Sequence, residues 1–211
     1  MNLPPRTVER LSKYRRLLEK FRKSDQIYIF SHQLAHMLNL TSVQVRRDLM
    51  LTGLSGNHRK GYNINELLKL IAQTIDHEKG HNIAIVGMGN LGRAVTRFIL
   101  KNSIRMNIVA AFDIDQSKIN DSMEGVPCYN VSMIGYFTEK LGIDIVVLTA
   151  SPESAQQVVN EVIASGVKGI LNFTPAHLDV PKHIYLKDYD IITSLEEIGF
   201  FIKNPQLISS E

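Results

Sequence analysis

The sequence has no tryptophan and only one cysteine, Cys128, among its 211 residues. A single cysteine excludes an intrachain disulfide, and no CxxC pair or Cys/His set is present that could hold a structural zinc ion. A small apolar packing role is therefore the better prediction for Cys128 than a redox role. We expect no metal site.

Long apolar segments are also missing. No run approaches the roughly 20 residues that cross a bilayer, and the segment 1–6 lacks the apolar core of a signal peptide. These absences predict a protein that engages no membrane and stays in the cytoplasm. The 44% of hydrophobic residues is still ample for one large domain or two small ones.

Charge is unevenly distributed along the chain. Residues 1–60 hold 12 Lys and Arg against 4 Asp and Glu, whereas the rest holds 12 against 17. A basic module joined to an acidic one suggests that a polyanion such as DNA binds at one end. A solvated, charged helix face explains part of the same asymmetry.

The most informative segment is Gly87-Met88-Gly89-Asn90-Leu91-Gly92. It follows the apolar run 83–86 and opens a segment of helical periodicity from Leu91 onward. Glycines at these positions permit a tight turn, let the backbone approach a pyrophosphate and allow close packing of helix on strand. The helix N-terminus then offers free N–H groups to the anion. The segment predicts a dinucleotide site, and a strand-helix turn without a ligand is the alternative.

A second apolar run, 108–112, ends at Asp113. A carboxylate at the end of this strand hydrogen-bonds the adenosine ribose 2′-hydroxyl and repels a 2′-phosphate. The sequence therefore favours NAD(H) over NADP(H).

The N-terminal part has the periodicity of several helices. Apolar residues at helical spacing predict an amphipathic helix over about 7–22, and a short helix follows over 31–38. A third helix begins at Thr41, which with Gln44 forms a capping box. A fourth helix extends over about 64–75.

In the third helix, Val45 and Leu49 lie four residues apart and face the core, which leaves polar and basic side chains on the other faces. This is the composition of a recognition helix, and the turn-rich, basic segment 52–62 is typical of a β-wing. The pattern predicts a winged helix-turn-helix domain, and a helical dimerisation or docking module is the alternative. The candidate DNA contacts are Ser42, Gln44, Arg46, Arg47, Arg59 and Lys60.

A polar linker over 76–80 places a domain boundary close to Gly80. Beyond it, strands and helices alternate, and near-continuous apolar runs predict parallel strands covered by helices on both faces. The strands are expected at 83–86, 108–112, 143–148 and 169–173, with helices at 91–101, 133–141 and 154–165.

The fold class expected is α/β. It comprises a winged helix-turn-helix domain over 1–79, a Rossmann-like doubly wound parallel sheet over 80–192 and a terminal helix within 193–211. Because a cofactor lies across the carboxyl ends of the strands, the loop that starts at Thr149 is a candidate cofactor contact. The apolar face of the terminal helix, residues 195–202, packs on its own domain or inserts into a partner subunit.

Catalytic equipment is not evident. A dehydrogenase needs elements that hold a substrate and supply an acid or base, and the chain has little room for them. The candidate acid-base groups are His81, His177 and His183, and none of them pairs with an evident Asp or Arg to form a recognisable hydride-transfer site. A nucleotide-binding domain joined to a basic winged helix is typical of a sensor. A small NAD-dependent oxidoreductase and a nucleotide-gated protein-interaction module remain alternatives.

The chain resembles the Rex family of redox-sensing transcriptional repressors over essentially its whole length. The resemblance rests on four segments: 43–49 in the third helix, 86–92 at the glycine turn, 112–115 after the second strand and 169–176 late in the sheet. It implies a homodimer that binds a palindromic operator and is released by NADH when the NADH/NAD⁺ ratio rises. It also implies a C-terminal helix swapped between subunits.

Position by position, the resemblance implies that Gly87, Gly89 and Gly92 hold the pyrophosphate and Asp113 the ribose. It implies that Arg46 and Arg47 meet DNA with Gln44 beside them, and that Arg16 and Asp190 couple the two domains.

The chain departs from the family pattern in two places, in the wing and in the helix that follows the glycine turn. Thr52 stands where the wing usually has an aromatic residue, and the arginine of the wing is shifted to the pair His58-Arg59. Phe98 replaces a tyrosine that hydrogen-bonds near the nicotinamide, so Phe98 is expected beside the cofactor without that bond.

Overall fold

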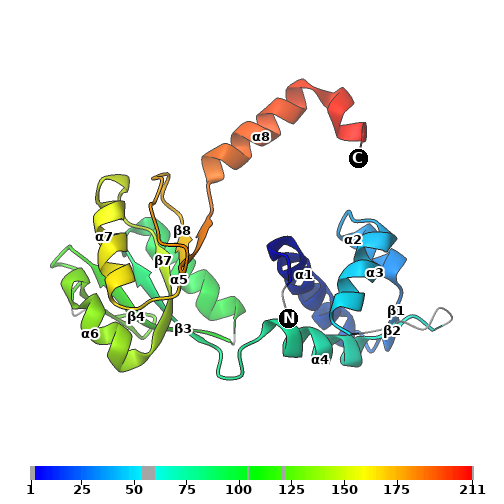
Figure 1. The fold of residues 1–211 in the computed structure, drawn as a ribbon, viewed down its shortest axis with the longest axis horizontal. Coiled ribbons are helices and arrows are strands. Elements are labelled where there is room, and N and C mark those ends of the chain that lie inside the picture. The colour runs from blue at the N-terminus through cyan, green and yellow to red at the C-terminus, as the bar shows by residue number, and fades with distance from the viewer. Residues whose placement is uncertain (1–2, 54–59, 104, 120–121, 211) are drawn as a thin grey trace. The chain divides into compact units, whose positions relative to one another are not determined.

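The computed structural model describes residues 3–53, 60–103, 105–119 and 122–210. The chain divides into two compact units, Met1–Glu78 and Lys79–Glu211, and the division falls inside the polar segment 76–80 (Figure 1). Each unit has a hydrophobic core of its own.

The described part of the first unit contains four helices and one pair of short strands. The helices are α1 (Pro5–Arg22), α2 (Ser31–Met37), α3 (Ser42–Leu51) and α4 (Ile64–Ile75), and β1 (Tyr28–Ile29) pairs antiparallel with β2 (Tyr62–Asn63). This order agrees with the helices expected from the sequence. The sequence does not predict strand β1, because a two-residue strand exists only through its distant partner.

Helix α1 begins at Pro5, two residues before the expected start. Proline suits the first helical turn because its fixed φ is already helical and its missing N–H is not needed there. Leu11, Tyr14 and Leu18 follow at spacings of three and four and are fully buried. One face of α1 therefore anchors the core of the unit.

Helix α3 begins as the sequence predicts, but its capping box is only half formed. The Thr41 hydroxyl accepts a hydrogen bond from the Gln44 backbone N–H at 3.1 Å. The Gln44 side chain does not return to Thr41; its Nε2 donates to the Asp48 carboxylate at 3.0 Å. A charged acceptor four residues along the same face forms the stronger hydrogen bond. Val45 and Leu49 are fully buried, as predicted.

Over its described residues, the second unit is built on a seven-stranded sheet in the order β5-β6-β4-β3-β7-β8-β9. Every neighbouring pair is parallel except β5 with β6. The strands are β3 (His81–Val86), β4 (Met106–Asp113), β5 (Ser122–Met123), β6 (Val126–Asn130), β7 (Ile143–Leu148), β8 (Gly169–Asn172) and β9 (Tyr185–Asp188).

Helices cover both faces of this sheet, because alternate residues of its central strand enter two different cores. Ala84 and Val86 of β3 pack with α6 (Ile134–Leu141) and α7 (Pro152–Ala164), whereas Ile83 and Ile85 pack towards α5 (Asn90–Asn102) (Figure 1). The fold is therefore the Rossmann-like α/β class expected from the sequence.

The sequence missed the two ends of the sheet. Strand β8 is not the last strand of the sheet, because β9 pairs with it. At the opposite edge, β6 pairs with β4 and β5 pairs with β6. Strand β6 contains Pro127, and three of the four residues of β9 are exposed. Outer strands of this kind have no continuous apolar run to reveal them. Cys128 lies in β6 and is buried in the core, as predicted.

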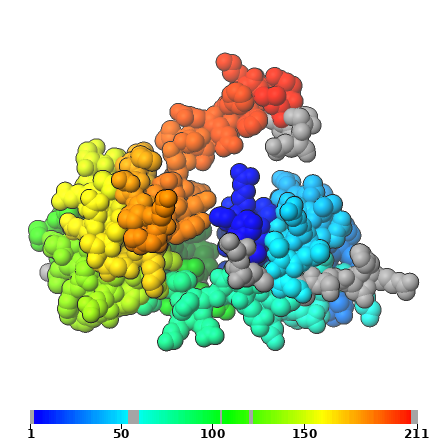
Figure 2. All heavy atoms as spheres, in the orientation of Figure 1, coloured from blue at the N-terminus to red at the C-terminus, as the bar shows by residue number. Residues whose placement is uncertain are grey.

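The terminal helix α8 (Ile191–Lys203) starts at Ile191, two residues before the segment 193–211 in which it was expected. A short 3₁₀ helix, 205–210, follows, and another, 131–133, precedes α6. None of the residues of α8 is buried, and its side chains lie at the surface in the space-filling view (Figure 2). Within the described ranges, no helix combines the length and the apolar character that crossing a membrane requires.

Candidate functional site

The glycine turn connects the end of β3 to the start of α5. Gly87 has a φ of 96°, and a Cβ added there would lie 2.7 Å from the backbone nitrogen of Ala150. A Cβ on Gly92 would collide with the carbonyl oxygen of Gly87. Both positions therefore require glycine, the first for its backbone conformation and the second for close packing of α5 on the strand.

Gly89 has a different environment. A Cβ added at Gly89 meets no atom within 4 Å, and this residue is the N-cap of α5 without any side chain capping the helix. The first N–H groups of α5 are therefore presented beside open space. A helix N-terminus of this kind binds a phosphate through backbone N–H groups and the helix dipole.

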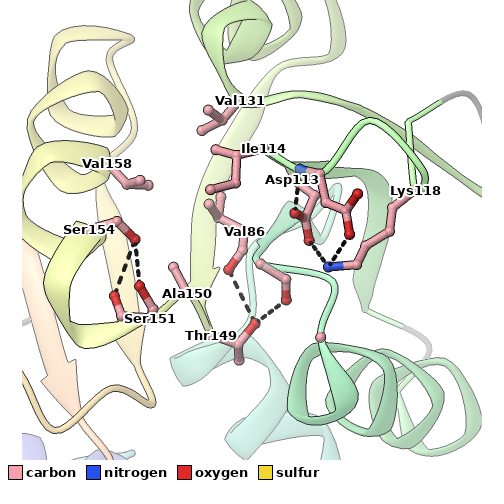
Figure 3. A pocket seen from close by; sticks show the side chains of 13 residues that line it. Val86, Asp113, Ile114, Lys118, Val131, Thr149, Ala150, Ser151, Ser154 and Val158 are labelled. Atoms are coloured by element: carbon pink, nitrogen blue, oxygen red, sulfur yellow. Dashed lines mark hydrogen bonds and ion pairs between the residues drawn. The ribbon is translucent and has the colours of Figure 1, made fainter.

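Thr149 ties the end of β7 to this turn. Its hydroxyl donates to the carbonyl of Gly87 at 2.7 Å and lies 3.1 Å from the carbonyl of Val86 (Figure 3). The same hydroxyl would lie 2.9 Å from a Cβ on Gly92. Thr149 therefore helps to fix the shape of the turn from the neighbouring strand.

Asp113 at the end of β4 is held by two backbone groups. Its Oδ2 accepts from the N–H of Met88 at 2.7 Å, and its Oδ1 accepts from the N–H of Asp115 at 2.9 Å. Burial alone raises the pKa of Asp113, but these hydrogen bonds and the Lys118 ammonium outweigh burial and hold the pKa below its usual value. Asp113 is an anion with a fixed orientation at neutral pH.

These groups surround one pocket of about 320 Å³, within the range of small-molecule sites. The pocket lies at the carboxyl ends of β3, β4 and β7. Strand β3 is flanked by β4 on one side and by β7 on the other, so the strand order reverses its direction at β3. Ligands of open α/β sheets bind in the crevice at such a point. The lining residues are Val86, Gly87, Gly89, Asp113, Ile114, Asp115, Lys118, Val131, Thr149, Ala150, Ser151, Ser154 and Val158.

Four of the predicted cofactor residues line this pocket: Gly87, Gly89, Asp113 and Thr149. The backbone N–H of Met88 donates to the Asp113 carboxylate, while the Met88 side chain is buried in the core. The remaining predicted residues are not among the lining: Asn90, Leu91 and Gly92 form the first turn of α5, and Phe98 lies further along α5 with 67% of its surface exposed.

Sequence reasoning did not single out the other lining residues, although Ala150 and Ser151 lie in the loop that starts at Thr149. Val131 follows β6, so finding that strand would have placed it by the same carboxyl-end argument. Ser151 and Ser154 begin α7, and their hydroxyl oxygens are 3.1 Å apart (Figure 3). Lys118 carries no periodic signal. It returns to Asp113 because the chain turns at 115–118, where the Lys118 N–H donates to the Asp115 carbonyl at 3.0 Å.

The candidate DNA contacts belong to the first unit. Arg46 and Arg47 of α3 are exposed, and Ser42 is partly buried at the start of the same helix. Arg46 also reaches the Ser31 hydroxyl of α2 at 3.5 Å. Lys60 is exposed, whereas Arg59 lies outside the described residues, as do the other residues of the predicted wing between 54 and 59.

Gln44 is the DNA candidate whose side chain is already engaged. Its amide donates to Asp48, a carboxylate with 1% of its side-chain surface exposed. Asp48 also accepts from the Tyr14 hydroxyl at 2.7 Å and from Arg10. Gln44 therefore belongs to a polar network between α1 and α3, and only the rest of its amide is available to a ligand.

The two residues expected to couple the domains are both exposed. Arg16 lies on α1, and Asp190 is the N-cap of α8, where its carboxylate accepts from the N–H and the hydroxyl of Thr193 at 3.0 and 2.7 Å. These bonds hold the pKa of Asp190 below its usual value, and the bond from the Thr193 hydroxyl has the largest effect. Asp190 is thus an exposed carboxylate that already has a role in starting α8.

Comparisons with known proteins extend over both units. Residues 2–49 match the family model described as "Putative DNA-binding protein N-terminus", and residues 78–176 match the one described as "CoA binding domain". A redox-sensing transcriptional repressor Rex from Listeria welshimeri is 33% identical over 202 residues, which cover 96% of this chain and 94% of the relative.

Solved structures give the same result. RSP, a Rex-family repressor, in complex with β-NAD⁺ and operator DNA superposes with a TM-score of 0.89 at 28% identity, over 99% of this chain and 96% of that chain. RSP in complex with β-NADH superposes with a TM-score of 0.85 at 27% identity, over 99% and 98% of the two chains. The similarity therefore covers nearly the whole length of both proteins.

Proposed function

This chain belongs to the Rex family of redox-sensing transcriptional repressors, and from that premise we propose that it is an NADH-responsive repressor of transcription. The observation that carries the proposal is the presence in one chain of the pocket that ends at Asp113 and of a helix that exposes Arg46 and Arg47. The RSP structures with NAD⁺, NADH and operator DNA support both halves of it.

The residues of the pocket fit a dinucleotide. Gly87 and Gly89 leave the N–H groups at the start of α5 open to a pyrophosphate, and the fixed carboxylate of Asp113 is an acceptor for the adenosine ribose. Ile114, 68% exposed on the Asp113 side of the pocket, offers apolar surface to an adenine. A bound nicotinamide cofactor supplies binding free energy here, and we assign no hydride transfer to the chain.

Residues 1–79 form the DNA-binding domain in this proposal. Arg46 and Arg47, with Ser42 and Lys60, contact phosphates and bases of the operator. Phosphate contacts release counterions, so the affinity should fall steeply with salt.

The coupling between the two functions requires two states. NADH releases DNA only if it binds the DNA-incompetent form more tightly than the competent one. We propose a homodimer on a palindromic operator, in which α8 packs into the partner subunit and Arg16 exchanges contacts with Asp190. The apolar side chains exposed along α8 support this arrangement. Because its target is chromosomal DNA, we propose that the protein acts in the cytoplasm.

The test is fluorescence anisotropy of a labelled palindromic duplex, titrated with the full chain at two salt concentrations and then with NADH or NAD⁺. We expect binding that weakens with salt and is released by NADH at a lower concentration than by NAD⁺. Consumption of NADH with a panel of carbonyl compounds, or release by NAD⁺ as readily as by NADH, would contradict the proposal.

A further inference from the structure

Lys118 lines the pocket with a positive charge, and the glycine-turn motif does not account for this cation. The Lys118 Nζ lies 3.1 Å from Oδ2 of Asp113 and 3.5 Å from a carboxylate oxygen of Asp115. The Lys118 side chain is 26% exposed, and that of Asp113 is 7% exposed. Figure 3 shows the Lys118 side chain extending from its loop towards the Asp113 carboxylate.

The position of this ammonium matters because it lies at the end of the pocket where a ribose 2′ substituent is recognised. A lone carboxylate at Asp113 would repel a 2′-phosphate, but a cation within 4 Å of the carboxylate cancels part of that field. A phosphate placed beside Asp113 is therefore also placed beside Lys118. Lysine is a common phosphate-binding residue.

The carboxylate does not depend on Lys118 for its orientation. The N–H groups of Met88 and Asp115 each donate to a different oxygen of Asp113. The ammonium therefore contributes charge at this position more than geometry.

From this arrangement we infer that Lys118 is a second determinant of cofactor specificity, and that the choice between NAD(H) and NADP(H) belongs to the Asp113–Lys118 pair. Asp113 neutralises Lys118 and excludes a 2′-phosphate. When the carboxylate is removed, Lys118 becomes a phosphate-binding cation and the preference changes to NADPH. The inference rests on the proposed function, because it concerns the same pocket.

The experiment measures the Kd of NADH and of NADPH for the full-length protein by their fluorescence. In Asp113→Ser, we expect NADH to bind about tenfold more weakly and NADPH at least about tenfold more tightly than in the wild type, as for the gain of a charged hydrogen bond. In Asp113→Ser/Lys118→Met, the gain for NADPH should disappear.

The matched control is Asp113→Ser/Lys168→Met, which removes the same charge elsewhere. Lys168 is 81% exposed and pairs at 3.6 Å with Asp144, at the opposite end of β7 from the pocket. This control should keep the tighter binding of NADPH. Asp113→Asn repeats the series with a side chain that still accepts from the Met88 N–H, in case the serine variant does not fold.

Equal Kd values for NADPH in the Asp113→Ser protein with and without Lys118 would overturn the inference while leaving the proposed function intact. A wild-type protein that binds neither cofactor would overturn the proposed function as well. A merely structural role of Lys118 would weaken both cofactors in parallel, and this result would also contradict the inference.

Discussion

Arg10 of α1 holds Asp48 of α3 through two hydrogen bonds, from Nε to Oδ2 at 2.6 Å and from Nη2 to Oδ1 at 2.7 Å. The Tyr14 hydroxyl and the Gln44 amide complete the set around a carboxylate that is almost entirely buried. The helix that we propose to enter the DNA groove is thereby fixed to the first helix of the unit. Asp48 does not need to touch DNA to be required for DNA binding.

The first prediction concerns the loss of this carboxylate. Asp48→Ala leaves Arg10 and the Tyr14 hydroxyl without their acceptor, and removal of one partner of a buried pair costs about 3 to 5 kcal/mol. We expect a loss of about this size in the free energy of unfolding of the first unit, measured in urea, together with loss of operator binding. Glu19→Ala, at an exposed position of α1, is the control. A loss below about 1 kcal/mol would show that the pair contributes little.

The second prediction is a pH dependence. Burial alone raises the pKa of Asp48, but the hydrogen bonds from Arg10, Tyr14 and Gln44 lower it by more than burial raises it. The folded pKa therefore lies below the unfolded value of about 3.9. The unfolded state therefore takes up the proton first as the pH falls. The stabilisation is fully present above about pH 5 and is lost as the pH falls through about 4 and below.

Unfolding of the wild type and of Asp48→Asn between about pH 7 and pH 3 measures this effect. The difference in stability between the two proteins should shrink as the pH falls, because Asn cannot titrate. A difference that stays constant over this range would mean that the pKa of Asp48 is the same in the folded and in the unfolded protein. The pKa of Asp113 is also lowered, but Asp113 is present in both proteins, so its contribution cancels in the difference between their stabilities.

The third prediction concerns the exposed arginines of α3. Arg46→Ala/Arg47→Ala should abolish operator binding at moderate salt, and NADH should bind as in the wild type because the pocket belongs to the other unit. Arg47→Ala alone should lower the slope of log Kd against log salt by about one for each phosphate that the arginine neutralises in the wild type. Lys168→Ala removes a cation from the second unit and is the control. Unchanged operator affinity in the double variant would exclude α3 as the recognition helix.

The fourth prediction tests the glycine turn. In Gly92→Ala the new methyl group meets the Gly87 carbonyl, so the first turn of α5 must shift away from the strand. We expect NADH to bind at least about tenfold more weakly, measured by fluorescence titration, since the displaced N–H groups no longer converge on a pyrophosphate. In Gly135→Ala of α6, the methyl group meets nothing within 4 Å. This control should bind NADH normally, with stability unchanged or about 0.5 to 1 kcal/mol higher.

The fifth prediction concerns α8. Ile198 is 55% exposed and Leu195 is 58% exposed on a helix without buried residues. If α8 packs into a partner subunit, Ile198→Asp places a charge in an apolar interface and should convert dimers into monomers at micromolar concentration, as measured by light scattering. Glu197→Asp at the neighbouring position is the control. A dimer that survives Ile198→Asp would locate the interface elsewhere.

The sequence determined the parts of this protein whose signal is local. The glycine turn, the acid at Asp113, the Thr41 cap and the apolar strand 143–148 could each be identified from a few neighbouring residues, because turn chemistry, capping and burial on both faces each impose a short pattern. The Rossmann-like fold and the main pocket residues follow from that pattern.

Tertiary structure alone decided what depends on residues far apart in the chain. Strands β6 and β9 exist because the sheet supplies partners for them, and Val131 enters the pocket only because β6 ends beside β4. Gln44 binds Asp48 instead of completing its capping box, since folding brings α1 against α3 and buries that carboxylate. Lys118 reaches Asp113 through the course of a loop that has no periodicity. Charge pairing and edge pairing are set by distance in space, which no pattern within one segment encodes.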